Sequence, residues 1–247
     1  MLIRELIFLS MKKRIYLILL SVPVFFFSCK DNTKFTEQLF TNQEITSALR
    51  LCKDSAVFYT CNALCLDTAK PGLGYYYFDA NSYRITLPPA AKSVMDTLAK
   101  HGFDVRLDSL VNRAAERCGN EMVRQFWKAH CDSIVFPNPH ATLHGGKSPV
   151  TDFVKQTKQT EFISVLVNSV LIEQFKELQV ITTWDSLQKA YFNITGIYAP
   201  IDILNPAAQQ MVTGFFRKMA IEEYAIRTDP SRQGSPKGTM RRVFATL

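Results

Sequence analysis

Glycine and proline are scarce in this sequence, with 10 and 11 residues among 247. Their scarcity excludes a collagen-like repeat, a low-complexity linker and an all-β architecture dense in turns. Charged residues reach only 21%, whereas hydrophobic residues make up 47% of the chain. Such a chain can bury a core and is not a disordered protein. We therefore expect one sizeable folded domain or two small ones.

A block of charge of one sign is also absent. The formal net charge is +7, but residues 1–28 hold four of the 29 basic side chains and only one of the 22 acidic ones. The remaining 25 basic and 21 acidic residues give +4, dispersed over more than 200 residues. Nucleic-acid binding, which needs a concentrated basic surface, is therefore not expected.

A basic segment precedes an apolar run near the N-terminus. Met11-Lys12-Lys13-Arg14 is followed by apolar residues from Ile15 to Phe27, interrupted mainly by Pro23. This run is shorter than the roughly 20 residues that a membrane-spanning helix needs. The pattern is typical of a secretory signal peptide. We predict a signal peptide over residues 1–28, with Met11 as an alternative start.

The apolar run ends in Ser28-Cys29, which resembles a bacterial lipobox. The resemblance implies that Cys29 is diacylated on sulfur and becomes the new N-terminus, followed by a polar tether over residues 29–40. One acyl chain binds membranes marginally, whereas two or three anchor stably. The predicted location is the Gram-negative cell envelope, lipid-anchored to the outer membrane and facing the periplasm or the surface. A plain signal peptide with a coincidental cysteine is the alternative.

The rest of the chain has the spacing of helices. Thr41 and Glu44 form a capping box, and apolar residues then recur every three or four positions. Further helix starts are predicted at Pro88-Pro89, Asp104, Asn138-Pro139, Ser148-Pro149, Thr183 and Asn205-Pro206. Strand patterns are almost absent. The prediction is one all-α, multi-helix bundle over residues 41–247 with an aromatic, Gly- and Pro-containing loop at about 67–87.

Several short motifs recur in a characteristic order over roughly residues 45–245. They are Gly74-Tyr75-Tyr76 with Ile85-Thr86-Leu87-Pro88, Asn112-Arg113-Ala114-Ala115-Glu116, Leu143-His144-Gly145-Gly146 with Thr151-Asp152-Phe153, and Glu222-Glu223 near Arg227 and Asp229-Pro230. This order resembles the bacterial family catalogued as domain of unknown function 4197, which comprises secreted or lipid-anchored helical proteins. The resemblance implies a helical fold and an envelope location. It implies no mechanism, because the family has no established activity.

Charged residues interrupt helix faces that should be packed. Arg113 and Glu116 interrupt an Ala-rich stretch. Glu222, Glu223 and Arg227 likewise interrupt the apolar spacing of the last long predicted helix. Buried charge is costly unless it is paired, so a cross-helix Arg–Glu network is one interpretation. A polar binding cleft built from the same residues is the other.

His140 and His144 are four residues apart, a spacing that places both imidazoles on one helical face and could chelate Zn²⁺ or Cu²⁺. No Glu follows His140, so the metalloprotease pattern is absent, and two half-exposed histidines are the commoner case. Gly145-Gly146-Lys147-Ser148 imitates the end of a phosphate-binding loop, but Ala141 stands where that motif needs glycine. No cofactor is expected.

The remaining candidate functional residues are cysteines and tyrosines. The five cysteines after Cys29 are an odd number, and their pairing stays open: Cys52, Cys61, Cys65, Cys118 and Cys131. Cys52 and Cys118 fall on apolar faces and are expected in the core. Tyr75, Tyr76 and Tyr77 either form an aromatic surface for a glycan, peptide or lipid or plug the end of the bundle.

These observations favour a non-enzymatic envelope lipoprotein whose helical domain binds an unidentified protein or small-molecule ligand. The alternative is an envelope hydrolase or metal-dependent enzyme that uses the His140 and His144 region.

Overall fold

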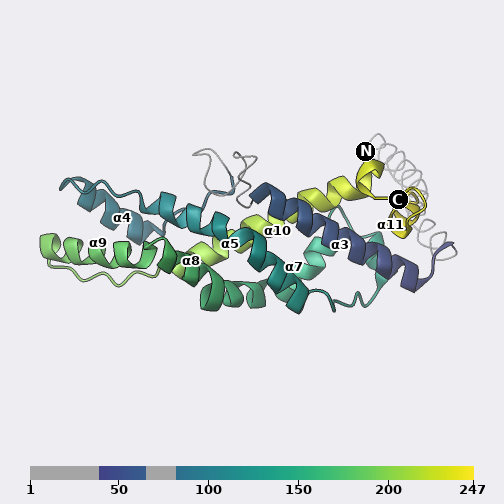
Figure 1. Ribbon diagram of the computed structural model, residues 1–247, viewed down its shortest axis with the longest axis horizontal. Coiled ribbons are helices and arrows are strands. Elements are labelled where there is room, and N and C mark those ends of the chain that lie inside the picture. The colour runs from purple at the N-terminus through teal and green to yellow at the C-terminus, as the bar shows by residue number, and fades with distance from the viewer. Residues whose placement is uncertain (1–38, 65–81) are drawn as a thin grey trace, which may run out of the picture.

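The computed structural model describes residues 39–64 and 82–247 of the chain. These residues form an elongated bundle of helices, and no strand occurs among them (Figure 1). The prediction of an all-α fold is therefore confirmed. Within the same residues, no helix is both long and apolar enough to cross a membrane.

Within residues 89–247 the helices are joined by short connections. Most are α-helical, but one turn of π-helix (η1) leads into α8, and one turn of 3₁₀-helix (η2) follows α10. In chain order they are α3 (Asn42–Leu64), α4 (Pro89–Ala99), α5 (Leu107–His130), α6 (Pro139–Leu143), α7 (Pro149–Val165), η1 (Leu166–Val170), α8 (Leu171–Glu177), α9 (Val180–Thr195), α10 (Leu204–Thr228), η2 (Pro230–Arg232) and α11 (Thr239–Phe244).

Local capping residues begin two of these helices. The Thr41 hydroxyl accepts the N–H of Glu44 at 3.2 Å, and the Glu44 carboxylate accepts the N–H of Thr41 at 3.0 Å. At the start of α6, Asn138 accepts the N–H of Ala141 at 3.0 Å. These bonds satisfy donors that the first turn of a helix leaves free. The predicted capping box at Thr41 is confirmed.

Two predicted helix starts are wrong. Helix α5 begins at Leu107 rather than at Asp104, and α9 begins at Val180 rather than at Thr183. Gln179 takes a left-handed backbone conformation with φ of 56°, which allows the chain to leave α8 and enter α9 within a few residues. Thr183 therefore lies inside α9 instead of capping it.

The hydrophobic core lies along the long helix α10. Towards its C-terminal end α10 packs against α3 and α7, and α11 packs on α3. In the other half of the molecule α9 packs against α4 and α5 (Figure 1). An aromatic cluster joins α5, α7 and α10: Phe126 stacks on Phe162 with ring centroids 4.4 Å apart, and Phe162 meets Phe215 edge to face at 5.4 Å.

Residues 84–88 form an extended segment held by two side-chain amides. Asn112 on α5 is fully buried; it accepts the N–H of Ile85 at 2.8 Å and donates to the Ile85 carbonyl at 2.7 Å. Gln210 on α10 likewise accepts the N–H of Thr86 at 3.0 Å and donates to its carbonyl at 2.8 Å. The two amides satisfy backbone groups that a neighbouring strand would otherwise pair. The segment thereby connects α5 with α10.

Some predicted features lie outside the described residues. They are the signal peptide (1–28), Cys29 with most of the tether, Cys65, and Tyr75, Tyr76 and Tyr77. Of the predicted loop at 67–87, only residues 82–87 are described.

Candidate functional site

A buried carboxylate lies at the start of α7. Glu223 on α10 is fully buried, and its two oxygens accept the N–H groups of Val150 at 3.0 Å and Thr151 at 2.7 Å. Both N–H groups belong to the first turn of α7, whose N-cap residue Ser148 makes no side-chain capping bond. A negative charge is favourable at this positive end of the helix dipole. Helix α7 is therefore capped by a residue of another helix.

Arg227 lies one turn further along the same face of α10. Its Nη2 donates to the Leu143 carbonyl at the end of α6 at 2.6 Å, and its Nη1 lies 3.6 Å from Oε1 of Glu223. Only 8% of the side chain is exposed, and Nη1 is buried without a hydrogen-bond partner among the described residues. A buried donor without an acceptor is costly. This guanidinium therefore has capacity for one more acceptor.

Burial is the largest influence on the pKa values of Glu223 and of the nearby Cys52. It raises the pKa of Glu223 above its ordinary value, although the hydrogen bonds from Thr151 and Val150 and the charge of Arg227 act in the opposite direction. Burial, reinforced by the Glu223 charge, raises the pKa of the fully buried Cys52 thiol well above its ordinary value. A buried thiol that stays protonated at neutral pH is a poor nucleophile.

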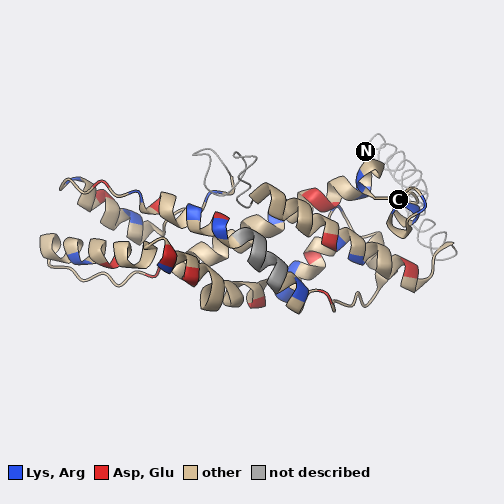
Figure 2. Ribbon diagram, viewed as in Figure 1, with Lys and Arg blue, Asp and Glu red and all other residues tan. Residues whose placement is uncertain are grey.

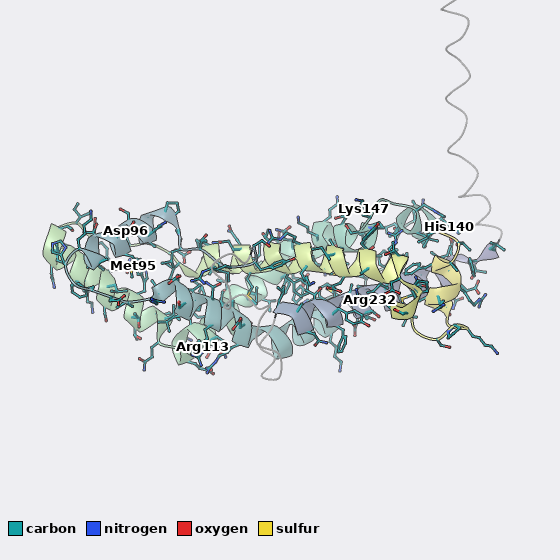
Figure 3. The ribbon with its side chains drawn as sticks, turned by 90° about the horizontal axis from the view of Figure 1, so that it is seen from above. Met95, Asp96, Arg113, His140, Lys147 and Arg232 are labelled. Atoms are coloured by element: carbon teal, nitrogen blue, oxygen red, sulfur yellow. The ribbon has the colours of Figure 1, made fainter. Side chains whose placement is uncertain are left out.

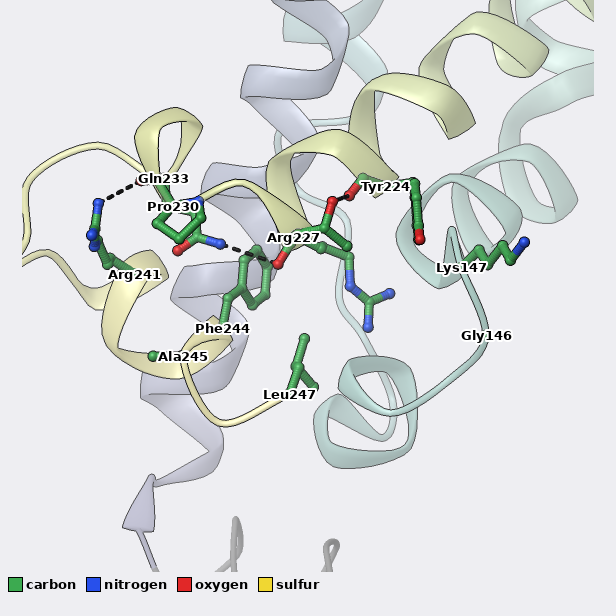
Figure 4. A pocket seen from close by; sticks show the side chains of 11 residues that line it. Gly146, Lys147, Tyr224, Arg227, Pro230, Gln233, Arg241, Phe244, Ala245 and Leu247 are labelled. Carbon is green, nitrogen blue, oxygen red and sulfur yellow. Dashed lines mark hydrogen bonds between the residues drawn. The ribbon is translucent and has the colours of Figure 1, made fainter.

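A pocket of about 470 Å³ opens beside Arg227, between the α6–α7 loop, the C-terminal part of α10, and α11 (Figure 4). Among the described residues its lining includes three basic side chains, Lys147, Arg227 and Arg241, and no acidic one. Nη1 of Arg241 donates to the Pro230 carbonyl at 2.6 Å, and the Lys147 ammonium lies 5.8 Å from the centre of the Tyr224 ring. The side chains that line the pocket are therefore basic or uncharged, and its size is typical of small-molecule sites.

Glu222 has a separate set of partners. Its Oε1 lies 2.6 Å from Nζ of Lys218, and its Oε2 lies 2.5 Å from Nη2 of Arg232. Arg232 also lies over the Tyr59 ring of α3, 4.1 Å from its centre. Burial acts to raise the pKa of Glu222, but the hydrogen bonds from Lys218 and Arg232 outweigh it and lower that pKa. This group of paired charges connects η2 and α10 with α3.

The sequence comparison covers the whole helical bundle. The model of the family described as Protein of unknown function (DUF4197) matches residues 41–245. The chain belongs to the DUF4197 family. The family resemblance expected from the motifs is thus confirmed. No curated protein and no solved structure matches the chain.

The segments that suggested the DUF4197 family meet at two places in the fold. At the site described above, residues 222–230 contact residues 143–146 and 151–153, through the bonds of Arg227 and Glu223. At the second place, residues 85–88 are bound by Asn112.

The structure brings together only part of the predicted polar network of this DUF4197 protein. Glu222, Glu223 and Arg227 lie together on α10, and Glu116 is buried on α5. Arg113 is exposed on α5, far from the pocket end that holds Lys147 (Figure 3). Successive helical residues point about 100° apart, so burial of Ala114 and Ala115 turns Arg113 towards solvent. The expectation that Arg113 belongs to a buried network is wrong.

His140 and His144 lie on α6 and at its end, close to the pocket. Nδ1 of His140 and Nε2 of His144 are buried, and neither has a hydrogen-bond partner in the described part of the chain. Burial, the neighbouring His140 and the charge of Arg227 together lower the pKa of His144. Among the side chains that the structure describes, no group of three or more His, Cys, Asp or Glu is placed to hold a metal ion.

Sequence reasoning did not identify Lys147 and Arg241 as members of one site. Lys147 stood out only within a sequence that imitates a phosphate-binding loop, and no sequence feature singled out Arg241. No local signal connects them, because they line one pocket only through the packing of α11 and the α6–α7 loop around α10.

The described cysteines are core residues in this DUF4197 protein. Cys52, Cys61, Cys118 and Cys131 are buried and free of disulfides. Burial raises the pKa of Cys118 and of Cys131 to about 12. These thiols are therefore unsuited to nucleophilic chemistry at neutral pH.

Proposed function

We propose that this DUF4197 protein is a lipoprotein of the cell envelope whose helical domain binds a small anion in the pocket beside Arg227. The proposed attachment is supported by the basic residues 12–14, the apolar run that follows them, and Ser28-Cys29 at its end. Two acyl chains on Cys29 would hold the protein stably at a membrane. The helical domain then acts as a binding module and catalyses no reaction.

The observation that carries the binding proposal is the buried guanidinium of Arg227. Its Nη1 lacks a hydrogen-bond acceptor among the described residues, and the 3.6 Å to Glu223 exceeds the length of a hydrogen bond. A carboxylate or phosphate offers two oxygens to a guanidinium fork, and such charge-assisted bonds are about twice as strong as neutral ones. Binding of an anion would satisfy this group.

The surroundings of Arg227 favour an anion over a cation. Lys147 and Arg241 add two positive charges to the lining, whereas Glu223 behind Arg227 supplies one negative charge. The local excess of positive charge concentrates anions at the pocket and disfavours cations. Basic and acidic residues elsewhere are interspersed along the helices (Figure 2).

Titration with inorganic phosphate tests the binding. The full-length protein, purified in a neutral maltoside detergent, should bind phosphate saturably, and phosphate should raise its melting temperature. Lys147→Gln and Arg241→Gln should each weaken binding several-fold, whereas Lys155→Gln, at an exposed position of α7, should leave it unchanged. Absence of saturable binding, or equal affinity in all three variants, would refute the proposal.

Metabolic labelling with a radioactive fatty acid tests the attachment. Cys29→Ala should abolish labelling and release the protein from the membrane fraction, whereas Cys65→Ala should retain both. Equal incorporation of label into the Cys29→Ala protein would show that the lipoprotein assignment is wrong.

A further inference from the structure

The basic pocket lies at the same end of the molecule as the first described residues. Arg242 of α11 lies 3.4 Å from Glu44 in the first turn of α3, and its guanidinium lies 5.5 Å from the centre of the Phe40 ring. Helix α11, which carries Arg241, packs along α3. The start of α3 and α11 therefore share one end of the bundle, opposite the end of α9 (Figure 1).

Chain length sets how far this end can lie from the proposed anchor. Leu39 lies ten positions after Cys29, and a fully extended chain spans at most about 35 Å over that length. If Cys29 carries acyl chains in a bilayer, the pocket end stays within a few tens of ångströms of the lipid head groups. The opposite end of the bundle is free to point away from the membrane.

The pocket has an apolar wall as well as a basic one. Phe244, Ala245 and Leu247 line it together with Lys147 and Arg241. Figure 4 shows the Arg227 guanidinium close to the ring of Phe244, and the distance from guanidinium carbon to ring centre is 6.0 Å. A free inorganic anion would satisfy the basic side chains and leave the apolar wall in contact with water. A ligand that joins an anionic group to a short apolar segment would cover both.

We infer that the pocket binds the phosphate head group of an anionic lipid in the membrane to which the protein is anchored. The lipid phosphate accepts from Arg227, while Lys147 and Arg241 add positive charge on either side of it (Figure 4). The glycerol and first methylene groups contact Phe244 and Leu247. A volume of about 470 Å³ accommodates a head group and the first part of the acyl chains but not two complete chains. This inference rests on the proposed anion binding and anchoring.

Tethering makes even a modest intrinsic affinity effective. A site held near a bilayer by a short linker meets its lipid at an effective concentration in the millimolar range. Two attachments, the acylated cysteine and the bound lipid, would also fix the direction in which the elongated bundle points. The membrane-proximal end would then be the one formed by α11 and the start of α3.

Three soluble probes distinguish a lipid site from a general anion site. The full-length protein in neutral maltoside micelles is titrated with dihexanoyl-phosphatidylglycerol, dihexanoyl-phosphatidylcholine or inorganic phosphate, and dissociation constants are measured calorimetrically. The anionic lipid should bind at least tenfold more tightly than either other probe. Lys147→Gln and Arg241→Gln should each weaken its binding at least fivefold, and Lys155→Gln should not. Circular dichroism verifies that each variant is folded.

The alternative outcomes separate the two proposals. Equal affinity for phosphatidylglycerol and inorganic phosphate would overturn the lipid inference and leave the proposed anion site intact. Equal affinity for phosphatidylcholine and phosphatidylglycerol would overturn the requirement for a net anionic head group. Binding of none of the three probes would overturn both the lipid inference and the proposed function.

Discussion

The carboxylate of Glu223 accepts the backbone N–H of Thr151 at 2.7 Å, although the two residues are 72 positions apart in the chain. This contact, with the adjacent bond from Val150, fixes the start of α7 against the C-terminal part of α10. It also holds a negative charge next to Arg227, which lines the pocket. The stability of the domain and the geometry of its pocket thus depend on the same buried carboxylate.

Replacement of that carboxylate should therefore be costly. Glu223→Gln removes the charge that faces Arg227 and leaves one N–H of α7 opposite an amide donor. Breaking a buried pair by removing one partner typically costs about 3–5 kcal/mol. Thermal and denaturant melts should show a loss of that order. Glu173→Gln, in an ion pair whose carboxylate is 60% exposed, is the matched control and should change stability by less than about 0.5 kcal/mol. Equal melting curves for the two variants would contradict the capping role.

Arg113 and Arg227 should differ sharply in their effects on stability. Arg113 is exposed on α5, so Arg113→Ala should alter the free energy of unfolding by less than about 0.5 kcal/mol. Arg227→Ala leaves Glu223 buried without its cationic neighbour and should destabilise by several times that amount. Urea denaturation of both variants measures the difference. A large loss in Arg113→Ala would mean that this arginine has a buried partner in the folded protein.

The extended segment at residues 84–88 should depend on one amide side chain. Asn112→Ala removes both hydrogen bonds to Ile85 and leaves its N–H and carbonyl without these partners. Each unsatisfied buried polar group costs about 1–3 kcal/mol. We expect a clear fall in melting temperature and faster hydrogen exchange at the Ile85 amide. Asn193→Ala, at an exposed position of α9, is the control and should change neither quantity.

Stability should fall as the pH drops below neutral, with His144 as a contributor. Burial, His140 and Arg227 lower the pKa of His144 from its ordinary 6.5, so the folded protein binds fewer protons there than the unfolded chain. The contribution of His144 to stability is therefore fully present above about pH 6.5 and is lost as the pH falls through its folded-state pKa. His144→Gln should therefore flatten the dependence of melting temperature on pH between about 7 and 5.

Glu223 changes the pH dependence of stability in the opposite direction to His144. Its raised pKa means that the folded state binds more protons than the unfolded chain as the pH falls towards the ordinary 4.5, which favours folding at acidic pH. Comparison of His144→Gln with the unmodified protein at each pH isolates the histidine, because Glu223 is present in both. An unchanged pH dependence in the variant would rule out His144 as a contributor.

The sequence by itself determined the features whose partners lie within one helical turn. The capping box at Thr41 and Glu44 and the cap at Asn138 are visible in the chain because donor and acceptor are three residues apart. The apolar spacing likewise determined an all-α fold, and the order of motifs indicated the family. These predictions succeed because the interactions that decide them are local, and they require no knowledge of which helices are neighbours.

Only the tertiary structure decided where the charged residues go. The spacing in α5 could not show that the packing of Ala114 and Ala115 turns Arg113 outwards, and the start of α9 depended on the left-handed backbone of Gln179. The cap of α7 comes from Glu223, and the pocket is lined by both Lys147 and Arg241. A buried charge or donor takes whichever partner packing brings within about 3 Å, and that partner can lie anywhere in the chain.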